Sequence, residues 1–457
     1  MLSKKTTALI AGAMAVGMTG QVMAEDAGLR SELAAVKARL AAMEQANSSE
    51  WLNERRAEEV KGLIRDVLSD ADTRATLLQD GVLAGNENGK FFLKSADGNF
   101  KMNIGAQLQV RYIAQFQNDR QTGVSGREDK TIHAFNVRRA KLKFSGTAFD
   151  PAVSYKFVLS TSRSTGNVMM EDAVVGWKMN DQWKFEAGVQ KVPFLREELV
   201  SSSRLLAVDR ASVTEFFTLD RATGLFATWT PNDDVKVRIA ATNDTITDAG
   251  DGYTPLGAMG GDISLTARAD VKLAGDWKQS KDYVAWQGGD QALFAGAAVN
   301  WQRGDRGQGV DTDYVSWTID GLFKCSTGWT ASAALSGAHS HDDAGSGGDW
   351  NAYGVLTQLA YNINDKWQPY VRYEMLNVDS KGADQVQGIT VGTNYFIKKH
   401  NLKFTTDLVW MFDGMAQSAN VWGANPFSSG LGLNGSGADK FDEDSLIAAR
   451  AQVQLAF

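Results

Sequence analysis

From residue 100 to residue 116, every second residue of the sequence is apolar, and the residues between them are mostly polar. An alternation with period two places the apolar side chains on one face of a β-strand and the polar side chains on the other. The segment is longer than the strands of most globular sheets. It is long enough to cross a membrane, for which a tilted strand needs about 9–11 residues. The pattern therefore predicts a membrane-crossing strand.

The same alternation recurs along the chain, for example at 263–273 and 447–457. Short turns alternate with longer, mostly polar connections, as in bacterial outer-membrane barrels, although the connection 275–290 is longer than this rule predicts. We expect an all-β fold in which residues 99–457 form a 16-stranded antiparallel transmembrane β-barrel. The predicted strands are 99–117, 134–149, 152–161, 170–179, 182–193, 222–230, 234–243, 262–274, 291–302, 313–324, 328–338, 351–362, 367–378, 386–397, 401–412 and 444–457.

Composition and tryptophan positions agree with a barrel. The sequence has 45 glycines but only 6 prolines, which suits many strands joined by tight turns. Trp183, Trp229, Trp329 and Trp367 lie beside predicted short turns, where an aromatic girdle would meet the edge of a membrane. The alternative is a soluble sandwich capped by tryptophans, which the length of the strands disfavours.

The N-terminus has the features of an export signal. Lys4 and Lys5 precede a short apolar run, and Val22-Met23-Ala24 fits a small-residue cleavage site. We expect residues 1–24 to be a signal peptide and the mature chain to lie in the bacterial outer membrane. The alternative, a membrane anchor, would need a longer apolar run. Because Cys325 is the single cysteine, an internal disulfide is excluded.

Between the export signal and the barrel, the sequence has a helical period. We interpret residues 25–80 as a periplasmic helical, coiled-coil segment and the glycine-containing residues 81–98 as a linker. The alternative is a lone amphipathic helix packed on a neighbour. The coiled-coil interpretation rests on apolar residues spaced by four and three positions in turn, which is an a/d heptad pattern, at Leu29, Leu33, Val36, Leu40 and Met43.

Residues 136–146 read Asn-Val-Arg-Arg-Ala-Lys-Leu-Lys-Phe-Ser-Gly and resemble the Arg-Arg-Ala strand of the phosphate-selective porin O/P family. The likeness extends over residues 99–225 and includes 188–194 and 201–210. In the remaining barrel it is limited to the strand pattern and the terminal Phe457. The resemblance implies a homotrimeric sixteen-stranded porin and suggests phosphate as a solute.

The net charge of −7 argues against a nucleic-acid partner, but the charges are unevenly distributed. If the apolar faces contact lipid, many lysines and arginines point into the barrel, whereas acidic residues gather in long connections such as 442–444. A cationic lining favours the passage of anions. The alternative is that the cations pair with carboxylates of the connections and leave little selectivity. The candidate pore-lining or anion-binding residues are Arg111, Arg139, Lys141, Lys143, Lys156, Arg196, Arg204, Arg210 and Arg238.

The connection 194–221 carries Arg196, Arg204 and Arg210 among large apolar residues such as Leu205 and Phe216. A connection that runs over the surface has little reason to contain so many apolar side chains. We expect it to fold into the barrel as a constriction. The alternatives are an exposed helical loop or a contact between subunits.

No arrangement of residues predicts catalysis. The four histidines fall in connections or at strand ends, and no nucleophile with a positioned histidine is recognisable. His339 and His341 could bind a metal with the acidic residues that follow, but their glycine-rich surroundings are a poor scaffold. We expect no enzymatic activity, metal or cofactor. The expected function is passive diffusion of small anionic solutes, with phosphate among them, through a trimer embedded in outer-membrane lipid. The alternative is a structural tether in which residues 25–80 contact the cell wall.

Overall fold

The computed structural model of the chain divides into two units, Met1–Gly81 and Val82–Phe457. In the first unit, residues 33–39 are helical, and Leu33 and Val36 are exposed there. The predicted signal peptide and most of the predicted coiled coil lie outside the described residues, so both stay predictions. None of the described helices is long and apolar enough to cross a membrane. The described residues are 31, 33–39, 41, 61–62, 65, 81–87, 89–117, 131–161, 166–243, 263–304, 312–342, 349–379, 385–411 and 446–457.

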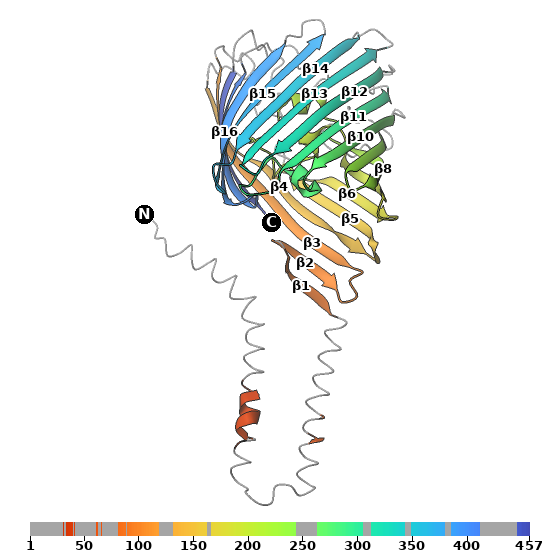
Figure 1. Ribbon diagram of the computed structural model, residues 1–457, viewed down its shortest axis with the longest axis vertical. Coiled ribbons are helices and arrows are strands. Elements are labelled where there is room, and N and C mark those ends of the chain that lie inside the picture. Colours follow the sequence, from red (N-terminus) through yellow and green to blue (C-terminus); the bar gives the residue numbers. More distant parts are fainter. Residues whose placement is uncertain are drawn as a thin grey trace, which may run out of the picture. The chain divides into compact units, whose positions relative to one another are not determined.

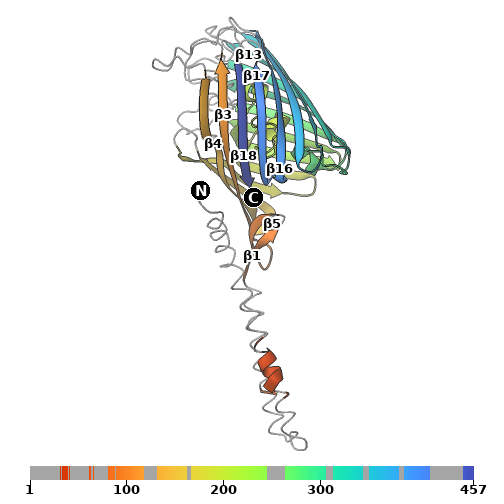
Figure 2. The same ribbon diagram turned by 90° about the vertical axis from the view of Figure 1, so that its left-hand side faces the viewer.

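The second unit is a closed antiparallel barrel. Each strand from β3 (Lys101–Gln117) onward pairs with the next, and β18 (Leu446–Ala456) pairs with β3, which closes the barrel (Figures 1 and 2). The prediction of sixteen antiparallel strands is confirmed, because each predicted strand overlaps one strand from β3 to β18. The strands between these two are β4 (Thr131–Ala148), β5 (Asp150–Thr161), β6 (Val168–Lys178), β7 (Trp183–Lys191), β8 (Arg221–Asn232), β9 (Val235–Asn243), β10 (Ile263–Ala274), β11 (Ala292–Gly304), β12 (Thr312–Lys324), β13 (Trp329–Asp342), β14 (Trp350–Tyr361), β15 (Trp367–Asp379), β16 (Val386–Lys398) and β17 (Leu402–Met411).

The predicted linker, residues 81–98, is corrected by the structure. It forms a hairpin of β1 (Val82–Glu87) and β2 (Lys90–Ser95), and β2 pairs with the start of β3. The turn accounts for the small polar residues, since Gly89 has a φ of +78° and its N–H donates to the Asn86 side chain over 3.1 Å. Glycine adopts a positive φ without strain. Both strands are only six residues long, so the sequence shows little alternation there, and its glycines indicated a linker instead.

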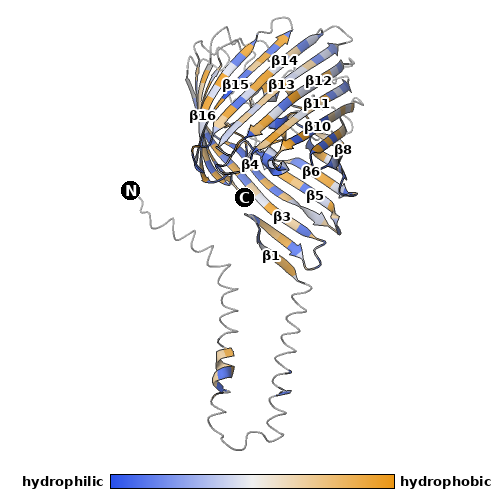
Figure 3. Ribbon diagram, in the orientation of Figure 1, coloured by the Kyte–Doolittle hydropathy of each residue, from blue (hydrophilic) through white to orange (hydrophobic). Residues whose placement is uncertain are grey.

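The two faces of the barrel wall differ in polarity. In β3 the side chain of Leu108 is 42% exposed on the outer face, whereas Gln109 on the inner face is 0% exposed. Figure 3 shows that hydrophobic and hydrophilic residues alternate along the strands. An exposed apolar surface that covers a whole barrel is expected in contact with lipid rather than water.

Aromatic side chains pair across neighbouring strands at the end of the barrel where the short turns lie, which we call the turn end. The ring centroids are 5.8 Å apart for Trp183 and Trp229, 4.6 Å for Trp329 and Tyr361, and 4.7 Å for Trp367 and Tyr395. This placement agrees with the girdle expected from the tryptophan positions. Most connections at the opposite end lie outside the described residues.

Candidate functional site

Residues 192–220, which connect β7 to β8, lie inside the barrel, and we call them the inward segment. It contains α3 (Arg196–Leu199) and α4 (Ser212–Phe217). Its Asp209 binds Arg138 of β4, while its Arg196 binds Asp320 of β12. In a ring of sixteen strands β4 and β12 are opposite each other, so the segment crosses the interior. The prediction that this connection folds into the barrel is confirmed.

The apolar residues of the inward segment pack against the wall. Val213 and Phe217 of α4 are buried in one cluster with residues of β14 and β15. Gly354 of β14 provides the space, because a Cβ at this position would lie 2.5 Å from a ring atom of Phe217. Burying a large apolar side chain stabilises a fold by about 1.5–3 kcal/mol. This packing explains why a connection carries so many large apolar residues.

Three arginines share the carboxylate of Asp209, which is fully buried. Arg111 Nη1 lies 2.8 Å from Oδ2, Arg139 Nη2 lies 2.9 Å from Oδ1, and Arg138 Nη2 lies 3.1 Å from Oδ1. Burial alone would raise the pKa of Asp209, but the arginines hold that pKa well below its usual range. Three guanidinium charges against one carboxylate leave a formal excess of +2 at this part of the wall.

Arg138 belongs to this cluster because of a β-bulge. Between β3 and β4, Gln109 lies opposite Arg139 and Val110 lies opposite Val137, so Arg138 is the extra residue. A bulge interrupts the alternation, and two consecutive side chains then reach the same region. Strict alternation places Arg138 on the lipid face, and for that reason it is missing from the predicted set. The consecutive arginines could have indicated the bulge, because an arginine in lipid is unfavourable.

A second bulge acts in the same way on β6. Val158 of β5 lies opposite Asp172 and Leu159 lies opposite Met170, so Glu171 is the extra residue there. Glu171 forms an ion pair with Lys141, and Asp172 pairs with Lys156 over 2.7 Å. The predicted cations Lys141 and Lys156 are therefore both paired with carboxylates. Strict alternation would have placed one of these carboxylates, Glu171, on the outer face.

On the opposite wall, arginines and carboxylates form a second network. Arg196 Nε lies 2.5 Å from Asp320 Oδ1, and its Nη2 lies 3.2 Å from Asp270 Oδ1. Arg238 Nη2 lies 2.6 Å from Asp270 Oδ2. Arg268 binds both carboxylates. Three arginines and two carboxylates leave a formal excess of +1.

Of the remaining predicted residues Arg210, Lys143 and Arg204, one has a carboxylate partner among the described residues. Arg210 lies 2.7 Å from Glu198, and burial would raise the pKa of Glu198 if Arg210 and Lys191 did not lower it. Lys143 donates to the Gln107 side chain over 2.8 Å. Within the described parts of the chain, neither Lys143 nor Arg204 has a carboxylate partner. Seven of the nine predicted cations are thus ion-paired. The alternative interpretation placed their partners in the connections. This holds for Arg111, Arg139 and Arg210, whereas the other four pair with carboxylates of the strands.

The most exposed cations of the inner wall lie on β5, β6 and β7. Their side chains are 49% exposed for Lys156, 55% for Lys178 and 41% for Lys184. By contrast, Arg372 of β15 and Arg450 of β18 are buried, as the inward segment packs nearby. Water therefore reaches the inner wall along a lysine-bearing side of the barrel.

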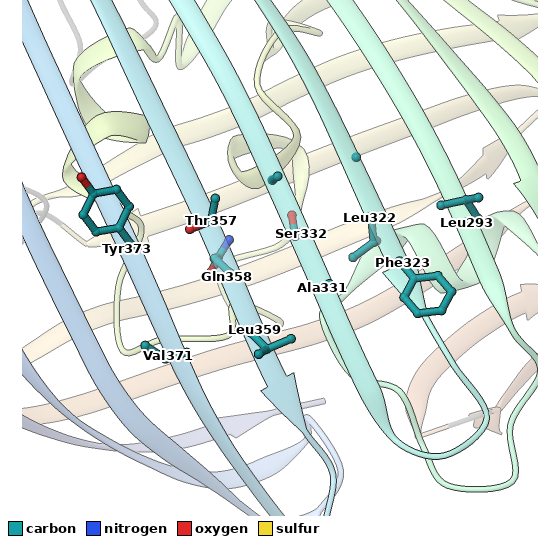
Figure 4. A pocket seen from close by; sticks show the side chains of 12 residues that line it. Leu293, Leu322, Phe323, Ala331, Ser332, Thr357, Gln358, Leu359, Val371 and Tyr373 are labelled. Carbon is teal, nitrogen blue, oxygen red and sulfur yellow. The ribbon is translucent and has the colours of Figure 1, made fainter.

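An apolar groove with a volume of about 450 Å³ lies over β11 to β15 (Figure 4). It is lined largely by side chains of the outer face, such as Phe323, Leu359 and Val371. Its lining has no charged group that would bind an anion, so it lies outside the site described above. In the described residues no group of histidine, cysteine and acidic side chains could hold a metal ion.

Residues 107–260 match the family model of phosphate-selective porin O and P. The resemblance inferred from the Arg-Arg-Ala strand is therefore confirmed for this region. It contains both bulges, the inward segment and the Asp209 cluster. No curated protein matches the sequence.

Several solved structures are similar to the barrel. An anion-selective porin from Comamonas acidovorans has 12% identity and a TM-score of 0.52, over 78% of this chain and 99% of that chain. OmpT of Vibrio cholerae in a trimer form has 12% identity and a TM-score of 0.49, over 77% and 99%. The outer membrane channel DcaP of Acinetobacter baumannii has 15% identity and a TM-score of 0.46, over 82% and 100%. The first likeness shows the fold of the barrel.

Proposed function

We propose that this chain is an outer-membrane porin, a water-filled channel through which small solutes diffuse with a preference for anions. A closed barrel with an apolar outer face and a polar inner face supports a channel in lipid. The family match over residues 107–260 supports the same function. The observation that carries the anion preference is the Asp209 cluster, where three arginines surround one carboxylate. A net positive charge inside a pore attracts anions and repels cations.

We further propose that phosphate is one of the anions that the channel binds. Guanidinium groups bind phosphate through paired hydrogen bonds. Arg111 Nη2 and Arg450 Nη1 are buried donors without a hydrogen-bond partner among the described residues. These donors lie on the neighbouring strands β3 and β18 and would suit the oxygens of a small oxyanion. A chloride current that falls when phosphate is added would support a phosphate site, and an unaffected current would contradict it.

We also propose a homotrimer in the outer membrane, with the N-terminal segment in the periplasm. The family resemblance and the heptad pattern of residues 29–43 support this arrangement. Sedimentation of the detergent-solubilised protein measures the assembly. A monomer that carries full channel activity would contradict the trimer.

The reversal potential across a salt gradient in planar bilayers tests the central proposal. We expect its sign to show that chloride permeates better than potassium. The preference should weaken at high salt, since screening shortens the reach of the fixed charges. A preference for potassium would refute the anion channel, and the absence of any conductance by folded protein would refute the porin.

A further inference from the structure

The connection between β10 and β11, residues 275–291, is long although it lies at the turn end of the barrel (Figure 1). We call it the strap. It begins with a capping box in which Asp276 and Gln279 bond reciprocally, and it continues as η1 (Trp277–Lys281). Farther on, Tyr283, Val284 and Ala285 are buried. A decorated surface turn would leave such side chains exposed, so the strap packs against the rest of the barrel.

The strap contacts four other turns of the same rim. These contacts extend from the β8–β9 turn to the β16–β17 turn, so the strap runs beside more than half of the strands at this end. A connection that only joined two neighbouring strands would not need them. The contacts are Trp277 Nε1 to Asp233 O at 2.7 Å, Gly288 N to Ser326 O at 2.8 Å, Gln287 Nε2 to Asn362 O at 2.7 Å, and the rings of Trp286 and His400 with centroids 6.3 Å apart.

The strap also touches the inward segment. Tyr283 belongs to the same buried apolar cluster as Leu205 and Leu206 of the inward segment and Phe294 of β11. The carbonyl of Tyr283 accepts a hydrogen bond from Gln368 of β15 over 2.9 Å. The inward segment therefore packs against the strap as well as against the barrel wall.

A half-buried carboxylate fixes the strap to the rim. Asp282 lies 2.5 Å from Lys324 Nζ at the end of β12 and 3.4 Å from His400 Nε2 in the β16–β17 turn. Lys403, which follows His400 closely in sequence, donates to the carbonyl of Leu205 in the inward segment over 2.9 Å. Asp282 thus joins the strap to the end of β12 through an ion pair with Lys324 and lies beside the His400 ring of a second turn, in addition to the apolar contacts.

We propose that the strap is a second selectivity element of the channel, which narrows the turn end and sets the largest solute that passes. The inference rests on the proposed porin function. The strap occupies space inside the rim between the β8–β9 and β16–β17 turns, and it holds the inward segment at a fixed height in the barrel. A solute that has passed the inward segment meets the strap before it leaves the channel.

Shortening the strap tests the proposal. Ala274 pairs with Leu293, so replacing residues 276–291 with Asn-Gly leaves a two-residue hairpin turn in register. We expect the shortened barrel to conduct at least about twofold more current and to admit larger sugars, because conductance and size limit follow the narrowest opening. Uncharged sugars of graded size in a liposome-swelling assay report the size limit independently of anion preference.

Point substitutions keep the test decisive if the shortened chain fails to fold. Asp282→Asn removes the carboxylate charge that pairs with Lys324, and we expect a higher conductance and a raised size limit. The matched control is Asp290→Asn, an exposed carboxylate of the same strap, which should leave both values unchanged. A folded shortened barrel or, failing that, a folded Asp282→Asn variant with wild-type conductance and size limit would overturn the proposal. Wild-type protein that forms no channel would instead refute the porin function.

Discussion

Arg138 and Arg139 are consecutive in the sequence, yet both side chains donate to the carboxylate of Asp209. The bulge in β4 makes this possible, and Asp209 comes from the inward segment on the far side of β7. The carboxylate that fixes the inward segment to the wall also removes one positive charge from the interior. We therefore expect the position of the inward segment and the proposed anion preference to depend on the same ion pair.

Replacing Asp209 with asparagine keeps the size of the side chain and removes its charge. We expect a stronger anion preference, because the interior gains one positive charge. We also expect a loss of stability of about 3–5 kcal/mol, since removing one partner leaves buried arginines without compensation. Reversal potentials and denaturant unfolding measure the two effects. Asp365→Asn, in the exposed β14–β15 turn, is the control; an equal change in both variants would contradict a special role for Asp209.

Arg139, Lys141 and Lys143 offer a second test of selectivity. Replacing all three with glutamate should lower the anion preference, and high salt should reduce the difference from wild type through screening. The control is Lys366→Glu, which makes the same change of charge in an exposed turn and should leave the anion preference unchanged. The measurement is again the reversal potential, on protein whose barrel resists detergent without heating. A folded triple variant with the wild-type value would show that these residues do not set selectivity.

The inward segment should make selectivity depend on pH. Burial raises the pKa of Glu215 to about 7, although Arg210 opposes the shift. The side chain is then neutral at pH 6 and negative at pH 8, so the anion preference should fall as the pH rises through 7. The free energy of unfolding should also fall between the ordinary pKa of 4.5 and about 7, because folding disfavours the ionised form.

The variant Glu215→Gln isolates this effect. We expect its reversal potential to change less between pH 6 and pH 8 than that of the wild type. At pH 8 it should prefer anions more strongly, since one negative charge is missing. The same pH dependence in variant and wild type would assign the titration to another group.

The N-terminal segment can be tested separately from the barrel. Leu33→Asp together with Leu40→Asp places charges in the predicted a/d seam and should dissociate the coiled coil while the barrel stays folded. Sedimentation of the isolated residues 25–80, with and without the substitutions, measures the association. Lys37→Asp is the control, because this position lies outside the seam. Full association of the double variant would contradict the heptad assignment.

Much of the barrel could be predicted from the sequence because its determinants are local. An alternation with period two fixes which side chains face lipid, and it repeats in each strand without reference to distant residues. The same alternation predicted the inner position of Arg111 and Lys143. It failed at Arg138 and Glu171, because a bulge adds one residue to a strand and moves two consecutive side chains to one face.

The partners of the charged residues were decided by the tertiary structure. The sequence shows lysines and arginines on the inner face of the strands and a long connection rich in apolar residues. It does not show that Asp209 reaches β3 and β4, or that the strap extends from Asp233 to His400 along the rim. Alternation is a property of neighbours in the chain, whereas an ion pair depends on where two distant segments meet. The sequence by itself therefore determined a barrel with a cationic interior, and only the folded chain determined which of those cations remain available to an anion.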